Sequence, residues 1–451
     1  MAEDIQNLLI LQQLLIVQQQ LQQQAYNEAA AVNIIRRRRR RRARQRRCWV
    51  RSFLGDVRSS QFGHFNRLMP ELRHEDPASF HNFLRIPPDM FDELLTRLNP
   101  RITKQDTNYR KAIDPGLKLA ATLRHLASGD TYASVKFDFR IPSNTLSLVV
   151  KEVCQAIVDE YKNEVIKFPT TPAEWAAVAE QFERRWNVPH GCGAFDGKHV
   201  AIRKPANSGS LYHNHQGFFL IVLMGLVDAD YNFLWIDVGG DGYMTDAMIF
   251  NESELKECLA DGSIGFPQPS PLPNDDRNMP YFILADDAFG LHTNLMKPYP
   301  QRNLTKEHRI CNYRISRGRR IMENGFGILA QRWQVLLGTM QQEPDTARLI
   351  VEACVCLHNL MRMRYPTLQN AALDYEDGYH DMVPGAWRQH ANMHDVDQAK
   401  GPNRDSTAAK KQRECLKLYF NSAAGSVHYK TEVTEVTEVT EDTVTWQDRM
   451  I

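Results

Sequence analysis

Residues 193–202 read Gly-Ala-Phe-Asp-Gly-Lys-His-Val-Ala-Ile, and the fold of the central part of the chain follows from this stretch. Apolar and small residues surround Asp196, so the pattern predicts a strand, Gly193–Ile202, that carries one acidic side chain. Further apolar runs predict strands at Phe218–Val227, Phe233–Val238 and Tyr281–Ala285. We therefore expect a β-sheet in this region of the chain.

Helical patterns alternate with these strands. Thr245 is expected to cap a helix that runs on through Leu255, and a second helix is expected over Asn312–Leu337. The second helix carries apolar residues at helical spacing, which indicate a core-facing stripe. The stripe consists of Met322, Phe326, Leu329, Trp333 and Leu336. Strand, strand, strand, helix, strand, helix is the expected order.

Three acidic residues occupy different local settings in this pattern. Asp196 lies in the first strand, Asp286 follows the fourth, and Glu323 lies at the edge of the helical stripe. Gly327 and Ala330 follow on the same side of the helix, and we expect these small residues to let the helix approach the sheet. Carboxylates from separate elements can hold two hard divalent cations that activate water and stabilise the leaving oxygen of a phosphodiester. The pattern therefore predicts nuclease or strand-transfer chemistry.

The chain resembles a known family through a series of short motifs in a fixed order, between about Trp49 and Tyr365. The segments are Gly129-Asp130-Thr131-Tyr132, Trp186-Asn187-Val188-Pro189, Gly193–Val200, Gly209-Ser210-Leu211-Tyr212, Thr245-Asp246, Ala285–Phe289, Asn312–Arg320 and Leu357-His358-Asn359. They are similar to those of the PIF/Harbinger transposases and the nuclease-like proteins derived from them.

This resemblance implies a DDE-type, RNase H-like catalytic domain. It places Asp196, Asp286 and Glu323 on the catalytic and metal-binding Asp, Asp and Glu, with Mg²⁺ or Mn²⁺ as the cofactor. The chain departs from the family pattern at two positions, with Ala285 where Gly is usual and Asp287 where Glu is usual. The resemblance also implies a separate Myb-like DNA-binding partner protein.

An arginine run dominates the charge distribution of the N-terminal part, although 55 basic and 54 acidic residues leave a net charge of only +1. The run consists of Arg36, Arg37, Arg38, Arg39, Arg40, Arg41 and Arg42, and Arg44, Arg46 and Arg47 continue it. Such a block repels itself and is typical of an arm that binds double-stranded DNA, a nuclear-import receptor, or both. A merely solubilising tail is the alternative. We expect a nuclear protein.

Ahead of the run, an apolar stripe is mixed with glutamines. Ile10, Leu14, Val17 and Leu21 recur at helical spacing, which is compatible with a short coiled coil and a homodimer. A low-complexity segment without fixed structure is the alternative.

Residues 51–170 are predicted to be helical, with a helix-turn-helix formed by Tyr132–Phe139 and Ser143–Tyr161. Ser143 is the expected N-cap of the second helix. The first turn of that helix would meet base edges and nearby cations would meet phosphates. The expected base contacts are Asn144 and Thr145; the expected phosphate contacts are Lys136, Arg140, Lys151, Arg319 and Arg320. Because many helix pairs bind nothing, a purely structural role is the alternative.

Several residues near the acids have weaker signals. Lys198 shares the strand face of Asp196 and is a candidate DNA contact, whereas His199 points to the opposite face and is expected to be structural. Asp246 is an auxiliary acid at a helix N-terminus. His358 and Asn359 lie in an apolar helix, where a buried, hydrogen-bonded histidine is expected.

We therefore expect an α/β protein in which an all-α, helix-turn-helix-containing region precedes an RNase H-like DDE domain. The expected segments are 1–35 (Gln/Leu-rich), 36–50 (Arg-rich arm), 51–170 (helical), 171–366 (nuclease) and 367–451 (a polar, mostly flexible tail that contains the Thr-Glu-Val repeat). The scattered cysteines predict a reducing compartment, and neither a signal peptide nor a membrane span is expected. The expected function is a metal-dependent DNA endonuclease and strand transferase. A non-cleaving DNA- or protein-binding nuclear factor is the alternative, and an RNase is a third class.

Overall fold

A computed structural model describes residues 18, 51–108, 111–214, 217–240, 242–370, 373–376, 382–389, 393–395 and 405–426. These residues belong to two compact units, Met1–Ser59 and Ser60–Ile451. The N-terminal apolar stripe, the arginine run and the Thr-Glu-Val repeat lie outside the described residues. In the first unit, Ser52–Leu54 form a 3₁₀ turn, η1.

The N-terminal half of the second unit is helical, as predicted. Its helices are α3 (Leu68–Glu75), α4 (Pro77–Leu84), α5 (Pro88–Ile102), α6 (Pro115–Ser128), α7 (Tyr132–Phe139), α8 (Ser143–Val165) and α9 (Pro172–Trp186), and α2 (Asp56–Phe62) precedes them. Local chemistry sets the boundaries: the Asp76 and Asp114 side chains accept backbone N–H groups at the starts of α4 and α6. Gly129, in the left-handed conformation, ends α6.

The helices α7 and α8 are joined by a short turn and pack against each other, in the place predicted for a helix-turn-helix. The predicted cap of α8 was wrong. Pro142 is the N-cap residue and provides no side-chain hydrogen bond, because the Ser143 hydroxyl instead donates to the Tyr132 carbonyl at 3.2 Å. Ser143 thus ties the second helix to the first.

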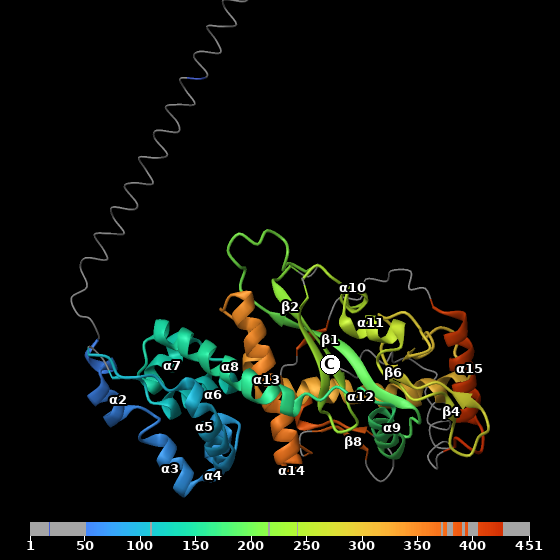
Figure 1. The fold of residues 1–451 in the computed structure, drawn as a ribbon, viewed down its shortest axis with the longest axis horizontal. Helices are drawn as coiled ribbons and strands as arrows, with labels where there is room; N and C mark the ends of the chain where they lie inside the picture. Colours follow the sequence, from blue (N-terminus) through green and yellow to red (C-terminus); the bar gives the residue numbers. More distant parts are fainter. Residues whose placement is uncertain are drawn as a thin grey trace, which may run out of the picture. The chain divides into compact units, whose positions relative to one another are not determined.

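One mixed sheet has the order β3-β2-β1-β6-β7 (Figure 1). Its strands are β1 (Gly191–Ala201), β2 (Leu220–Val227), β3 (Phe233–Gly240), β6 (Phe282–Leu284) and β7 (Leu295–Met296), and β10 (His394–Asp395) also pairs with β1. The strands β1, β2 and β3 are antiparallel, whereas β6 is parallel to β1 and β7 is parallel to β6. The four predicted strands are confirmed to within about three residues. Two short pairs lie outside this sheet: β4 (Ser270–Pro271) with β5 (Asn278–Met279), and β8 (Tyr375–Glu376) with β9 (Met382–Val383).

Each face of the sheet has its own helices. Gly225 is opposite Asp196 in the register, and a Cβ added at Gly225 would lie 2.9 Å from Met322 Cε of α12 (Lys306–Arg332). A Cβ at Gly197, the next residue of β1, would instead lie 2.3 Å from Asp246 Oδ1 of α10 (Asp246–Asn251). Asp196 therefore faces α12, and α10 covers the other face. The helix α13 (Pro344–Arg364) packs on β3 and on α8, which connects the sheet to the helical half.

Two predicted helices differ in their bounds. The helix expected from Thr245 through Leu255 is two helices, α10 and α11 (Glu254–Asp261), because the Ser253 side chain accepts the Lys256 N–H and starts a new helix. The helix expected over Asn312–Leu337 is α12, which starts six residues earlier at a Thr305 cap and is followed by the 3₁₀ turn η2 (Gln334–Leu336). Its predicted apolar stripe is buried as expected.

The close approach of α12 to the sheet depends on a glycine that the sequence reasoning overlooked. A Cβ at Gly318 would lie 2.3 Å from Leu284 Cδ1 of β6, so a larger residue there would require the buried Leu284 side chain to move. The expectation for Gly327 was wrong, because a Cβ there would meet the indole of Trp387 at 2.3 Å and not the sheet. Gly327 makes room for a segment from the C-terminal part of the chain.

Parts of the range predicted as a polar tail pack on this unit. The described elements there are β8, β9, η3 (Ala386–Gln389), β10 and α15 (Thr407–Asn421), and α14 (Pro366–Asn370) begins the range. Leu416 and Phe420 of α15 are fully buried, and α15 packs against α12. The Arg314 guanidinium of α12 lies over the Phe420 ring, 4.6 Å from its centroid.

Candidate active site: a buried carboxylate pair

Asp196 and Asp286 are brought together by the register of two parallel strands. Ala194 of β1 is paired with Leu284 of β6, and each aspartate lies two residues further along its own strand direction. Because side chains alternate along a strand, both aspartates are on the same face as the residues of that pair. Neighbouring strands are about 4.8 Å apart, so the two carboxylates are close neighbours. This is the face that α12 covers.

Both carboxylates resist ionisation. Burial is the main cause that raises the pKa of Asp196 to about 6; the nearby Asp286 carboxylate contributes to this increase, while Lys198 and Arg319 oppose it. Burial also raises the pKa of Asp286, whose side chain is 6% exposed, and Arg319 again opposes the increase. Two neighbouring acids with raised pKa values are a mark of a functional site, because a stable core would not place them together without compensation.

Cationic side chains flank the pair. Lys198 lies on the same face of β1 as Asp196, as predicted, but it is only 5% exposed and acts on both aspartates from inside the protein. Arg319 of α12 also influences both carboxylates. The Asp286 side chain is held by the turn that follows it, because its Oδ1 accepts the Ala288 N–H at 2.8 Å.

Glu323, the third predicted acid, is on α12 one turn beyond Arg319, so it lies on the same side of the helix. Its Oε2 is 3.4 Å from Nη2 of Arg388, and its side chain is 35% exposed. In the part of the chain that the structure describes, no three His, Cys, Asp or Glu side chains are gathered closely enough to hold a metal ion. The structure thus assembles two of the three predicted acids.

The donor chemistry of the pair nevertheless suits a hard divalent cation. Carboxylate oxygens are the ligands that Mg²⁺ and Mn²⁺ prefer, and a cation between Asp196 and Asp286 would offset the burial that raises both pKa values. Glu323, one helical turn from Arg319, is the nearest predicted source of a third oxygen.

The remaining acids and His199 lie elsewhere. Asp246 is buried against the opposite face of β1, so it does not join the pair. Asp287 has an exposed side chain whose Oδ1 is 3.9 Å from Lys297 Nζ. His199 is buried on the face opposite Asp196, with its ring 6.1 Å from that of Phe218, as expected for a structural residue.

His358 and Asn359 form a second buried polar cluster, with the structural role predicted for them. His358 Nε2 is 2.9 Å from the Tyr231 carbonyl oxygen, and burial lowers its pKa to about 3. The Asn359 side chain accepts the Phe233 N–H and donates to the carbonyls of Phe233 and Val165. The cluster joins α13, β3 and the end of α8.

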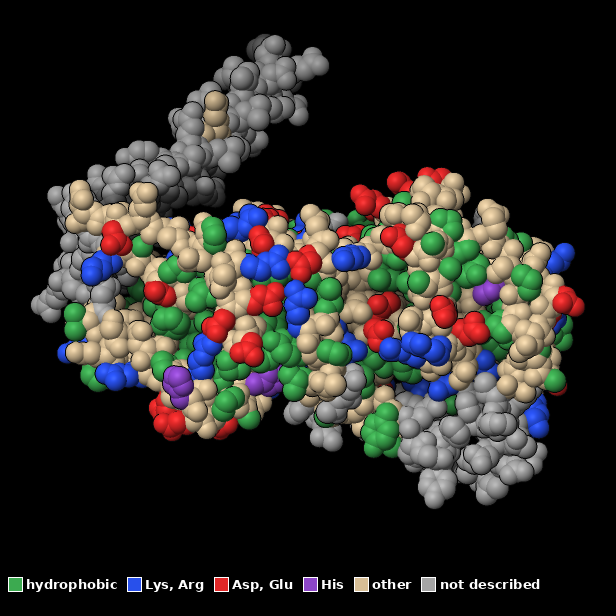
Figure 2. All heavy atoms as spheres, turned by 60° about the horizontal axis from the view of Figure 1, so that its bottom comes forward, with side chains coloured by type: hydrophobic (Ala, Val, Ile, Leu, Met, Phe, Trp, Pro, Cys, Tyr) green, Lys and Arg blue, Asp and Glu red, His purple; other side chains and the backbone are tan. Residues whose placement is uncertain are grey.

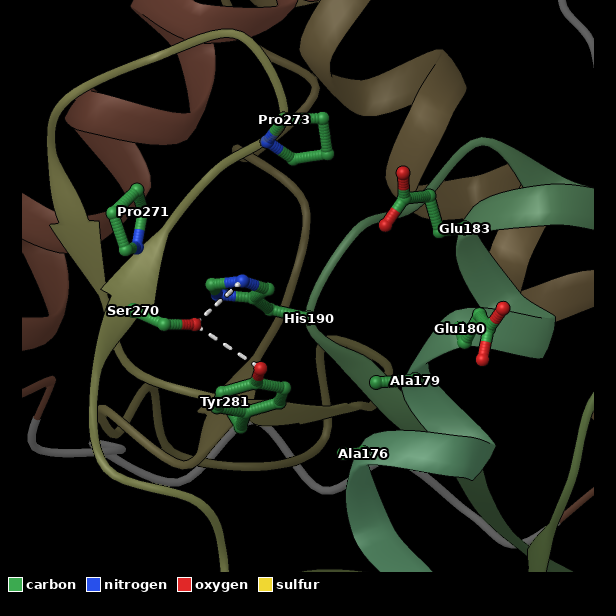
Figure 3. Close-up of a pocket in the computed structure, with 9 residues that line it drawn as sticks. All are labelled: Ala176, Ala179, Glu180, Glu183, His190, Ser270, Pro271, Pro273 and Tyr281. Atoms are coloured by element: carbon green, nitrogen blue, oxygen red, sulfur yellow. Dashed lines mark hydrogen bonds between the residues drawn. The ribbon is translucent and has the colours of Figure 1, made fainter. Parts of the chain in front are cut away.

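A pocket of about 260 Å³ lies between α9 and the β4–β5 pair, and neither Asp196 nor Asp286 lines it (Figure 3). Ser270 Oγ lies 3.3 Å from His190 Nε2 and 3.1 Å from Tyr281 OH, and the two rings are stacked at 4.2 Å. His190 Nδ1 bonds the Met279 carbonyl. Because Glu180 and Glu183 line the same pocket, it would repel the phosphates of a nucleic acid.

The predicted DNA contacts are spread over the described surface. Asn144 and Lys151 are exposed on α8, while Lys136 lies over the Phe137 ring, 4.2 Å from its centroid. Figure 2 shows Lys and Arg side chains interspersed with Asp and Glu over one face. DNA binding by these residues stays a prediction.

Sequence reasoning missed Arg388 and Asp374. The Arg388 guanidinium donates to both oxygens of the buried Asp374 carboxylate, at 2.7–2.9 Å, besides its contact with Glu323. Neither residue lies in a periodic segment, so no pattern indicated them. The adjacent Trp387, a large apolar residue in a polar stretch, was the available signal.

Comparisons with known proteins agree with this architecture. Residues 195–359 match the family described as DDE superfamily endonuclease. The chain is 25% identical to "Protein ALP1-like" of Arabidopsis thaliana, over 68% of this chain and 76% of that protein. It is also 25% identical to "Putative nuclease HARBI1" of Homo sapiens, over 60% of this chain and 74% of that protein. No solved structure matches the chain.

Residues 195–359 therefore form a domain of the DDE endonuclease superfamily, and this domain has a mixed α/β fold. The matched domain together with these relatives supports the Harbinger-type DDE family. Among the described residues, no helix combines the length and the apolar character needed to cross a bilayer.

Proposed function

We propose that this protein is a divalent-metal-dependent endonuclease of the transposase type that hydrolyses phosphodiester bonds in double-stranded DNA. The observation that carries the proposal is the Asp196–Asp286 pair: the half-buried Asp196 of β1 and the buried Asp286, two residues past the end of the parallel strand β6, face α12 together. The strand order β3-β2-β1-β6-β7, with three antiparallel strands followed by parallel ones, supports an RNase H-like fold.

Asp196, Asp286 and Glu323 are the residues that would hold Mg²⁺ or Mn²⁺ ions. Two such ions, when bound, activate a water molecule and stabilise the leaving oxygen. Arg319 and Lys198 act on both carboxylates and would offset their negative charge, so that a negatively charged phosphate can enter the site. In hydrolysis, the water oxygen bonds to phosphorus while the bond to the leaving sugar oxygen breaks. A second attack by the freed 3′-hydroxyl would make the protein a strand transferase.

DNA binding is proposed to rest on the arginine run and on the first turn of α8, where Asn144 is exposed. The run would also direct the protein to the nucleus, and a Myb-like partner would add recognition. Deleting Arg36–Arg47 should weaken binding to every duplex and flatten its salt dependence by about 0.9 in log–log slope per lost phosphate contact. Titration of a labelled duplex at several salt concentrations measures this slope.

The proposed activity is tested by cleavage of duplex DNA in Mg²⁺ or Mn²⁺, with RNA assayed beside it. The variants Asp196→Asn, Asp286→Asn and Glu323→Gln each keep the side-chain shape but remove one negative charge. We expect each to lower cleavage by at least roughly 100-fold, because each removes a metal-binding charge from the reaction. Asp287→Asn is the matched control, since that side chain is exposed and points toward Lys297.

One observation favours the non-cleaving alternative, namely that Arg388 contacts Glu323 and places a fixed positive charge beside the third acid. A protein that keeps this fold to bind DNA or a partner would show no metal-dependent cleavage, with or without a partner present. Equal cleavage by the wild type and all three acid variants would also reject the proposed active site.

A further inference from the structure

A segment from the C-terminal part of the chain lies on α12 around Glu323. The Trp387 indole packs over Gly327 and donates its Nε1–H to Asn324 Oδ1 at 2.7 Å. The Asp374 N–H donates to the same oxygen at 3.2 Å. Trp387 and Asp374 are both buried, so this part of the segment is held firmly against the turn of α12 that carries Glu323.

The segment positions Arg388. The Arg388 Nε–H lies 2.9 Å from both oxygens of Asp374, and Nη2 lies 2.7 Å from Oδ2. Asp374 is in turn fixed by the Gly385 N–H at 2.8 Å. The guanidinium is thus anchored by a buried carboxylate before any contact with Glu323 is considered.

The contact with Glu323 is the longest of these interactions, at 3.4 Å between Nη2 and Oε2. Both side chains are about one third exposed, so the pair is weaker than the buried one with Asp374. It can therefore break while Arg388 stays anchored. Arginine stays charged at any physiological pH, so its pull on Glu323 is constant.

We propose that Arg388 is a positioning residue that acts as an internal counter-cation for Glu323 and competes with a divalent metal ion for that carboxylate. The proposal rests on the proposed function, since it assigns Glu323 to the same metal site. A metal ion recruits Glu323 only by displacing it from Arg388. Arg388, anchored by Asp374, would thereby set the metal concentration at which Glu323 joins the site.

The test is a measurement of Mn²⁺ affinity by calorimetry on the full chain, without any cleavage assay. Arg388→Ala should bind Mn²⁺ roughly threefold to tenfold more tightly than the wild type, because Glu323 no longer has a competing cation. Adding Glu323→Gln to Arg388→Ala should remove that gain. Arg314→Ala is the control: Arg314 lies on α12, as Glu323 does, and joins that helix to the C-terminal part of the chain through the Gly425 carbonyl, but its contacts are away from Glu323.

Arg388→Lys covers the case in which the alanine variant fails to fold. Lysine keeps the charge that Asp374 neutralises, but it lacks the fork needed to reach Glu323 at the same time, so it should also tighten Mn²⁺ binding. Unchanged or weaker binding in the folded Arg388 variants would overturn the proposal. If the wild type and Asp196→Asn show the same Mn²⁺ affinity, the proposed metal site itself is wrong, which is a separate failure.

Discussion

Two polar clusters in this protein differ in how the cost of burying their polar groups is compensated. His358 and Asn359 lie where α13 meets β3 and α8; the Asn359 amide and the Nε2 atom of His358 bond to backbone groups. Asp196 and Asp286 lie under α12, next to each other, and burial raises the pKa of both. Hydrogen bonds offset the burial of the first cluster, whereas burial disfavours the charged form of both acids in the second. A polar cluster that costs stability is the one to examine for function.

Asn359→Ala should have the largest effect on stability. The substitution leaves the Phe233 N–H and the carbonyls of Phe233 and Val165 without these hydrogen bonds in the interior. We expect a loss of about 2–4 kcal/mol in the free energy of unfolding, because each unsatisfied buried group costs ~1–3 kcal/mol. Urea denaturation followed by circular dichroism measures it. A loss below 1 kcal/mol would remove the contrast between the clusters.

Asp196→Asn should instead stabilise the protein at pH 8 in the presence of a chelator. The unfolded carboxyl ionises near pH 4, but the folded one holds its proton until about pH 6, so the fold loses stability as the pH rises between these values. Removing the charge should increase the free energy of unfolding by about 1–2 kcal/mol at pH 8 and leave it unchanged near pH 4. Denaturation curves at both pH values give the comparison. A destabilised variant at pH 8 would show that the carboxylate is compensated after all.

The pH dependence of the histidine cluster should have the opposite sign. The folded His358 has a pKa of about 3, while the unfolded side chain titrates near 6.5, so stability falls as the pH drops through this range. Between pH 7 and pH 5, protonation of His358 in the unfolded state should lower the free energy of unfolding by about 1–2 kcal/mol. The His358→Gln variant should therefore lose less stability than the wild type between pH 7 and pH 5. Urea denaturation of the two proteins at both pH values measures this difference. Parallel pH profiles for the two proteins would contradict the assignment.

The sequence predicted where Asp196 and Asp286 lie in the fold, but it did not predict the contacts of the Glu323 side chain. The alternation around Asp196 and the apolar run before Asp286 were sufficient to place Asp196 on a strand and Asp286 just after one, because strand periodicity is local. The position of the Glu323 side chain depends on Arg388 and Asp374, which are 65 and 51 residues away in sequence and lie in a stretch without periodicity. The break between α10 and α11 was missed because Ser253 is a good cap inside an otherwise helical pattern.

The helix–sheet contact shows the same limit. Sequence spacing drew attention to Gly327, yet Gly318 is the residue that lets α12 touch β6. Both glycines are in one helix, and only the three-dimensional neighbours, Leu284 for one and Trp387 for the other, distinguish their roles. Packing partners distant in sequence cannot be read from a single helical pattern.

The central claim is that the Asp196–Asp286 pair is a divalent-metal site, and ligand-linked stability tests it most directly. The free energy of unfolding at pH 8 is measured in chelator and in Mg²⁺. At a Mg²⁺ concentration about 100 times the dissociation constant, the wild type and the Asp287→Asn control should gain about 2.7 kcal/mol. Asp196→Asn and Asp286→Asn should gain almost nothing. Equal gains in all four proteins, or no gain in the wild type, would contradict the account.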